Sequence, residues 1–130
     1  MIICDTHALV YDALSPDLLG AKAAKAMEKA AAAGDLACAD ISLWEIAMLI
    51  EKGRLKVDCP VEEFLTLMIS ARRLNVLPVT PDIAALSASN IVPDGDPADR
   101  LIAATAISLG APLVTRDKRL QGLKGLPTIW

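Results

Sequence analysis

The sequence has few aromatic residues, little cysteine and only a small excess of negative charge. Phe, Trp and Tyr make up 3% of the 130 residues, so stacking of bases on aromatic side chains is not expected to dominate any binding of nucleic acid. The net charge of −3 provides no overall basic surface for a polyanion. The three cysteines have no metal-binding spacing. We interpret them as reduced residues of a cytosolic protein, with Cys4 and Cys38 in the apolar core.

Long apolar runs and glycine-rich loops are also missing. No apolar run has the roughly 20 residues that a membrane helix needs, and no basic segment precedes an apolar run at the N-terminus. We therefore expect a cytoplasmic protein with no membrane contact. The patterns G-x-G-x-x-G, Walker A and G-x-S-x-G do not occur, which argues against dinucleotide binding, P-loop chemistry and an α/β-hydrolase serine. The single histidine, His7, has no spacing that supports a Ser-His-Asp device.

What the sequence does contain is a regular alternation of short apolar segments and amphipathic ones. A hydrophobic content of 54% and a length of 130 residues predict one domain, residues 1–130, with a real core. We expect strands at 1–5, 36–39, 76–79, 113–114 and 128–130, and helices at 6–14, 18–33, 42–52, 60–74 and 97–109, with one more opened by Pro81. This order predicts an α/β fold, in which helices cover both faces of a mostly parallel sheet of about five strands.

Four acidic residues occupy related places in this pattern. Asp5 and Asp117 follow predicted strands, and Glu45 and Asp99 lie in the first turns of predicted helices. Ligands of open α/β sheets bind beyond the carboxyl ends of the strands, so the four carboxylates are expected to converge there. Carboxylates brought together repel one another unless a cation lies among them, and oxygen ligands suit Mg²⁺ or Mn²⁺.

Helix capping is the competing interpretation of each acid taken singly. The segments 42–45 and 96–99 both have the pattern of a capping box, with Ser42 and Asp96 as the N-cap residues. Asp5 and Asp117 could likewise do no more than begin helices. Capping does not, however, predict that two of the four acids follow strands at the same edge of the sheet.

Four segments, taken together and in order, resemble the PIN-domain ribonucleases, and specifically the VapC-like toxins of bacterial toxin–antitoxin pairs. They are ICDTHAL at 3–9, SLWEIA at 42–47, GDPADRLIAATA at 95–106 and APLVTRD at 111–117. The resemblance implies a parallel sheet with helices on both faces and a metal-dependent endoribonuclease. It also implies an RNA substrate, a cognate antitoxin and a homodimer. The apolar character of residues 60–74 agrees with such an association.

The resemblance also implies roles for particular residues. Asp5, Glu45, Asp99 and Asp117 would be the catalytic acids and would hold Mg²⁺ or Mn²⁺, with Thr6, Thr115 and Asp96 in support. Arg100 and Arg116 lie beside two of the acids in the sequence, where they could draw a phosphate-bearing substrate. Relatives often have His two residues before the position of Asp96, where this chain has Asp94.

Other classes of function remain open at this point. A catalytically silent PIN-like module that binds RNA or protein would be expected to have lost one of the acids. A metal-dependent DNA nuclease would share all of the chemistry. An aspartyl phosphatase would need a second Asp two residues after the nucleophile, and His7 stands there instead.

Overall fold

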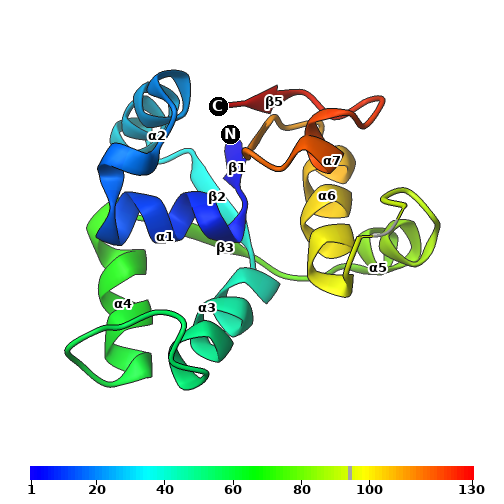
Figure 1. The fold of residues 1–130 in the computed structure, drawn as a ribbon. Helices are drawn as coiled ribbons and strands as arrows, with labels where there is room; N and C mark the ends of the chain where they lie inside the picture. Colours follow the sequence, from blue (N-terminus) through cyan, green and yellow to red (C-terminus); the bar gives the residue numbers. More distant parts are fainter. Residues whose placement is uncertain (94) are drawn as a thin grey trace.

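The computed structural model describes residues 1–93 and 95–130, and in them one five-stranded parallel sheet (Figure 1). The strands β1 (Ile2–Cys4), β2 (Leu36–Ala39), β3 (Asn75–Leu77), β4 (Leu113–Val114) and β5 (Thr128–Ile129) lie in the order β3-β2-β1-β4-β5. Cys4 pairs with Cys38 on one side and with Val114 on the other, so β1 is the central strand. The predicted α/β fold is confirmed.

Helices cover both faces of this sheet. They are α1 (Thr6–Leu14), α2 (Ala21–Ala33), α3 (Ile41–Glu51), α4 (Val61–Arg72), α5 (Pro81–Ala88), α6 (Pro97–Leu109) and α7 (Lys118–Gln121), with a 3₁₀ turn, η1, at Pro16–Leu18. In Figure 1 the sheet separates α1, α2 and α4 from α5, α6 and α7. Among the described residues, no helix is long and apolar enough to cross a membrane.

Alternation along the strands produces two cores. Cys4, Cys38 and Val114 point to the face covered by α1, α2 and α4. Ile3, Ala37, Ala39 and Leu113 point to the opposite face, where Ile102, Ala103 and Ala106 of α6 meet them. Because successive residues of a strand face opposite sides, short apolar strands can serve both cores. The expectation that Cys4 and Cys38 are core residues is confirmed, and neither forms a disulfide.

The sheet has its switch point between β1 and β4. From β1 the chain builds outward through β2 and β3 on one side, and β4 and β5 lie on the other. Such a point leaves a crevice beyond the carboxyl ends of the two central strands. The segments that leave β1 and β4 there carry Asp5 and Thr115–Asp117.

Candidate functional site

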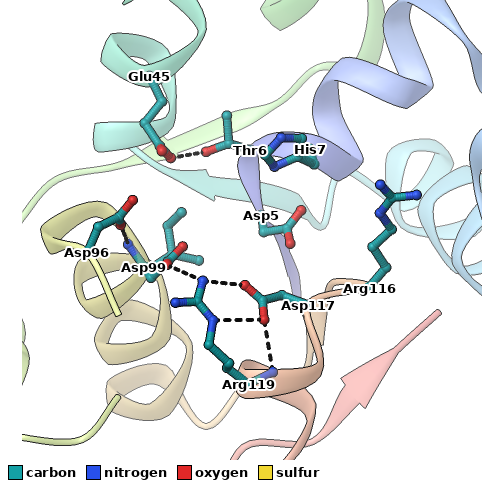
Figure 2. A pocket seen from close by; sticks show the side chains of 10 residues that line it. Asp5, Thr6, His7, Glu45, Asp96, Asp99, Arg116, Asp117 and Arg119 are labelled. Carbon is teal, nitrogen blue, oxygen red and sulfur yellow. Dashed lines mark hydrogen bonds and ion pairs between the residues drawn. The ribbon is translucent and has the colours of Figure 1, made fainter. Parts of the chain in front are cut away.

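A pocket of about 330 Å³ opens at this crevice, and all four of the predicted acids line it (Figure 2). They come from four separate places in the chain: the end of β1, α3, α6 and the start of α7. The full lining consists of Asp5, Thr6, His7, Glu45, Asp96, Asp99, Ile102, Arg116, Asp117 and Arg119. Thus the expected convergence of the four carboxyl groups is present in the fold.

Asp5 lies deepest in this group and is 7% exposed. Its Oδ1 accepts a hydrogen bond of 2.8 Å from the backbone N–H of Ala8, so Asp5 is the N-cap of α1. Its Oδ2 accepts a short hydrogen bond from the hydroxyl of Thr115. Burial raises the pKa of the Asp5 carboxyl, and these two hydrogen bonds partly offset that effect. Capping and a place in the pocket are therefore compatible at this residue.

Glu45 reaches the pocket from the first half of α3. The hydroxyl of Thr6 donates a short hydrogen bond to Glu45, and Thr6 Oγ1 also lies 3.0 Å from the hydroxyl oxygen of Ser42. Burial raises the pKa of the Glu45 carboxyl, and the nearby charges of Asp96 and Asp99 raise it further.

The prediction that Ser42 caps this helix is wrong. The helix begins one residue earlier, at Ile41, and follows Asp40, whose side chain makes no capping bond. Ser42 is fully buried inside the first turn and meets Thr6. The reason is that α3 starts directly after β2, so its first turn packs against α1 instead of facing water.

Asp96 and Asp99 stand together at the start of α6. The Asp96 side chain accepts a hydrogen bond of 2.8 Å from the backbone N–H of Asp99, which confirms Asp96 as the N-cap. Burial raises the pKa of the Asp99 carboxyl, and the charge of Asp96 adds to this effect. The helix therefore begins with two carboxylates that stabilise its N-terminus but repel each other.

Asp117 is paired with a cation that the sequence analysis did not assign to the site. Arg119 Nη2 lies 2.9 Å from Asp117 Oδ2 and 2.9 Å from Asp99 Oδ2, and so bridges the two acids. Hydrogen bonds from Arg119 lower the pKa of the Asp117 carboxyl, which also caps α7. The signal for Arg119 was its place in the basic cluster at 116–119, which by itself does not tell which side chain enters a pocket.

The remaining predicted residues divide into two groups. Thr6 and Arg116 line the pocket, and the fully buried Thr115 donates to Asp5 and accepts a 3.0 Å hydrogen bond from the backbone N–H of Asp117. Arg100 is not among the lining residues, and its Nε is buried without a hydrogen-bond partner in the described part of the chain. Asp94 lies outside the described residues, so the effect of its place near the site stays a prediction.

The donor set fits a hard divalent cation in its chemistry, because every carboxyl group that lines the pocket supplies oxygen. In residues 1–93 and 95–130, however, no three His, Cys, Asp or Glu side chains are arranged to hold a metal ion as they stand. The acids bond instead to Thr6, Thr115 and Arg119. A cation among the four acids would therefore have to take over the place that the Arg119 guanidinium has between Asp99 and Asp117.

Comparisons of the sequence with family models and with known proteins point to the same family. The model of the PIN domain family matches residues 2–126. The chain is 37% identical to Ribonuclease VapC22 of Mycobacterium tuberculosis (strain ATCC 25618 / H37Rv) over 123 residues, which cover 92% of this chain and 89% of that protein.

Solved structures share the fold at lower identity. VapBC2 from Rickettsia felis, bound to a DNA fragment from its promoter, has a TM-score of 0.73 at 20% identity, with 98% of this chain and 97% of that chain covered. DNA-bound VapBC from Salmonella typhimurium has a TM-score of 0.70 at 19% identity, with 98% and 97% covered. Because the family model spans nearly all of its residues, this chain belongs to the PIN domain family.

Proposed function

We propose that this protein is a Mg²⁺- or Mn²⁺-dependent endoribonuclease and the toxin of a toxin–antitoxin pair. The observation that carries the proposal is the convergence of Asp5, Glu45, Asp99 and Asp117 on one pocket at the switch point of the sheet. The likeness to a protein named as a ribonuclease supports RNA as the substrate. The likeness in fold to VapBC structures agrees with a toxin.

In this proposal Asp5, Glu45, Asp99 and Asp117 would hold the cation, with Asp5 and Asp99 as its direct ligands. A divalent ion in such a site lowers the pKa of bound water and neutralises the charge that builds up on a phosphate. The hydroxyl of Thr115 fixes the orientation of the Asp5 carboxylate, and that of Thr6 fixes Glu45. The two threonines thereby hold carboxylates in place that would otherwise turn away from each other.

Arg119 offsets part of the negative charge of the pocket before a metal ion is bound. Its guanidinium contacts two of the four carboxylates, and its side chain is 49% exposed, so it has room to move aside. Without a cation the remaining acids would repel the RNA backbone. A divalent ion is therefore needed for productive binding of RNA as well as for cleavage.

The antitoxin is proposed to cover an apolar pocket that adjoins the acids. This second pocket is lined by Ile41, Trp44, Pro97 and Ala98 together with Glu45 and Asp96, which the two pockets share. Trp44 is 58% exposed. An antitoxin segment that buries apolar side chains there could place a basic residue among the carboxylates, where it would compete with the metal ion.

The test is cleavage of RNA by the purified protein with Mg²⁺, with EDTA, and in the Asp5→Asn variant. Cleavage that needs Mg²⁺ and falls at least about 100-fold in Asp5→Asn is expected, since the variant loses a charged ligand at the centre of the site. Asp17→Asn, on the exposed turn η1, is the matched control and should cleave at the wild-type rate. Single-stranded DNA of the same sequence is the second substrate.

The outcomes separate the remaining classes of function. Binding of RNA with no cleavage under any metal would identify a silent binding module. Faster cleavage of DNA than of RNA would identify a DNA nuclease. Either result would contradict the proposed activity. The proposal also includes a cytoplasmic location, in agreement with three cysteines that form no disulfide.

A further inference from the structure

We propose that Tyr11 and Arg116 form a preassembled platform that holds one nucleotide of single-stranded RNA beside the acid pocket. This inference rests on the proposed nuclease function and names the class of RNA that the site takes. Aromatic side chains are rare in this chain, with two Trp, one Tyr and one Phe. Two of these four, Tyr11 and Trp130, nevertheless lie together, and Tyr11 also meets His7 and Arg116 of the pocket lining.

The platform is built from three separate parts of the chain. The Arg116 guanidinium carbon lies 5.0 Å from the centre of the Tyr11 ring. Ring centres of His7 and Trp130 lie 6.2 and 6.3 Å from that of Tyr11. Gly20 leaves room for Trp130, since a Cβ there would come within 2.5 Å of the Trp130 backbone. Neighbouring rings thus support Tyr11, and Tyr11 in turn supports Arg116.

Among the described residues, Arg116 is the arginine of the pocket lining for which no carboxylate partner is found. Arg119, the other arginine there, is bound to Asp99 and Asp117. Arg116 is exposed, and none of the ion pairs found within the described residues includes it. Figure 2 shows it across the pocket from Asp96 and Asp99, with Asp5 and Asp117 between. Its charge is therefore available to a phosphate of a strand that runs over the acids.

The chemistry of a stacked arginine fits a single strand of RNA. A guanidinium held over a ring still presents N–H groups to phosphate oxygens, and the plane of an arginine is also a surface on which an unpaired base can stack. Proteins that bind single strands combine such cations with aromatic contacts, and these contacts tolerate any base. In a duplex the bases are paired and stacked on one another, so the platform would have only the phosphate to bind.

The test is the affinity of the purified protein for a labelled single-stranded 2′-O-methyl oligoribonucleotide, measured in Mg²⁺ by fluorescence anisotropy, with gel electrophoresis to show that the strand stays intact. Arg116→Ala and Tyr11→Leu should each weaken binding about tenfold, in the range expected for loss of one stacked contact. Arg116→Lys keeps the charge but not the flat cation, so its loss should lie in between. Tyr11→Phe keeps the ring and should bind like the wild type.

Lys118→Ala is the matched control for charge. Lys118 is an exposed cation two residues from Arg116 and is not part of the pocket lining, so its loss should change the affinity by less than about twofold. An oligoribonucleotide with abasic sites provides a second readout, because it changes the RNA and leaves the fold of the protein untouched. The wild type should prefer the normal oligonucleotide, and Arg116→Ala and Tyr11→Leu should lose that preference.

Two results would overturn the platform while the nuclease proposal stands. One is a wild type that cleaves RNA together with an Arg116→Ala variant that binds the oligonucleotide as tightly as the wild type does. The other is equal binding of the normal and abasic oligonucleotides by a wild type that cleaves RNA. Tighter binding of polyglutamate than of RNA, lost in Arg116→Ala, would assign Arg116 to an acidic protein segment instead. A wild type that neither binds nor cleaves RNA would overturn both proposals. Thermal melting of each variant shows whether it folds. If Tyr11→Leu does not fold, the two Arg116 variants and the abasic oligonucleotide still test the proposal.

Discussion

At the scale of single residues, the four acids of the pocket differ in electrostatic environment. Burial raises the pKa of the Asp5, Glu45 and Asp99 carboxyl groups, whereas Arg119 lowers that of Asp117. Asp99 and Asp117 share the same arginine, but Asp99 is more buried and faces Asp96 at close range. The pKa of Asp99 is raised because burial and the charge of Asp96 disfavour its ionised form more than the charge of Arg119 favours it.

This difference predicts opposite effects of two matched substitutions in the metal-free protein at pH 7. Asp99→Asn should raise the melting temperature by a few degrees, because it removes a charge that the folded state disfavours. Asp117→Asn should lower it by a similar amount, because it removes a charge that Arg119 stabilises. Asn can still cap α7, so loss of the cap does not confuse the comparison. Differential scanning calorimetry is the measurement, and a shift of the same sign in both variants would contradict this electrostatic account.

A pH series tests the same idea at Glu45. The folded state raises the Glu45 pKa above its ordinary value of 4.5, so it holds this proton more tightly than the unfolded state does. The resulting stability is present below pH 4.5 and is lost as the pH rises through the raised value. The melting temperature of Glu45→Gln relative to wild type should therefore increase from pH 4 to pH 7. Glu51→Gln, at the exposed end of the same helix, is the control, and a parallel pair of curves for Glu45→Gln would refute the prediction.

The sequence could predict which acids meet but not how each is bonded. Asp5 and Asp117 are found from their place after strands, and Asp96 from a capping pattern that the structure confirms. Ser42 follows the same pattern and was predicted wrongly, because contact with Thr6 is a tertiary feature that no local pattern contains. Arg119 was missed for the same reason, since Asp99, its second partner, is 20 residues away in the chain.

At the scale of secondary-structure elements, boundaries were predicted best where both ends carry a signal. Helix α6 begins with Pro97, directly after the N-cap Asp96, and its last residue is Leu109. The C-cap, Gly110, has a left-handed φ of 60° that favours glycine. The predicted range 97–109 is confirmed. Helix α4 was predicted to run to residue 74 but ends at Arg72. Its C-cap, Arg73, has a left-handed φ of 49° without being glycine, so the sequence gives no stop signal there.

One ion pair joins the elements that support the pocket. Arg72, in the last turn of α4, reaches Asp12 on α1 through two hydrogen bonds of 2.6 and 2.8 Å, and the Asp12 side chain is 8% exposed. A third bond of 2.8 Å reaches Glu28 on α2, which is 72% exposed. Since α1 also carries Thr6, His7 and Tyr11, this pair holds one wall of the pocket in place.

Removing Arg72 should therefore cost more than removing its exposed partner. Arg72→Met is expected to lower the free energy of unfolding by about 2 kcal/mol, because it leaves a buried carboxylate without its cation. Glu28→Gln should cost less than about 0.5 kcal/mol, as is usual for exposed pairs. Urea denaturation measures both. Equal losses of unfolding free energy in the two variants would show that the buried contact with Asp12 stabilises the fold no more than the exposed contact with Glu28 does.

At the scale of the whole molecule, several large apolar side chains remain in contact with solvent. Leu67 of α4 is 57% exposed, Trp44 of α3 is 58% exposed and Leu18 of η1 is 51% exposed. This agrees with the expectation that the helix predicted at 60–74 carries more apolar residues than one face of a sheet needs.

We predict that the protein is a homodimer with two-fold symmetry, because exposed apolar side chains are stabilised by burial against a second copy. Sedimentation equilibrium at micromolar concentration should give twice the chain mass of 13.7 kDa. Leu67→Glu should shift the protein towards the monomer if α4 forms the interface, and Lys29→Glu, on the exposed face of α2, should not. A wild-type monomer at these concentrations would contradict the prediction and leave the proposed chemistry intact.

The central claim is that four acids from four parts of the chain form one cation site, and binding of Mn²⁺ followed by electron paramagnetic resonance tests it most directly. The wild type should bind Mn²⁺ saturably, and Asp5→Asn and Asp99→Asn should each weaken binding at least about tenfold, since each removes a charged ligand. Asp17→Asn, far from the pocket, should bind like the wild type. Saturable binding that is the same in all four proteins, or no binding at millimolar Mn²⁺ in the wild type, would contradict the account.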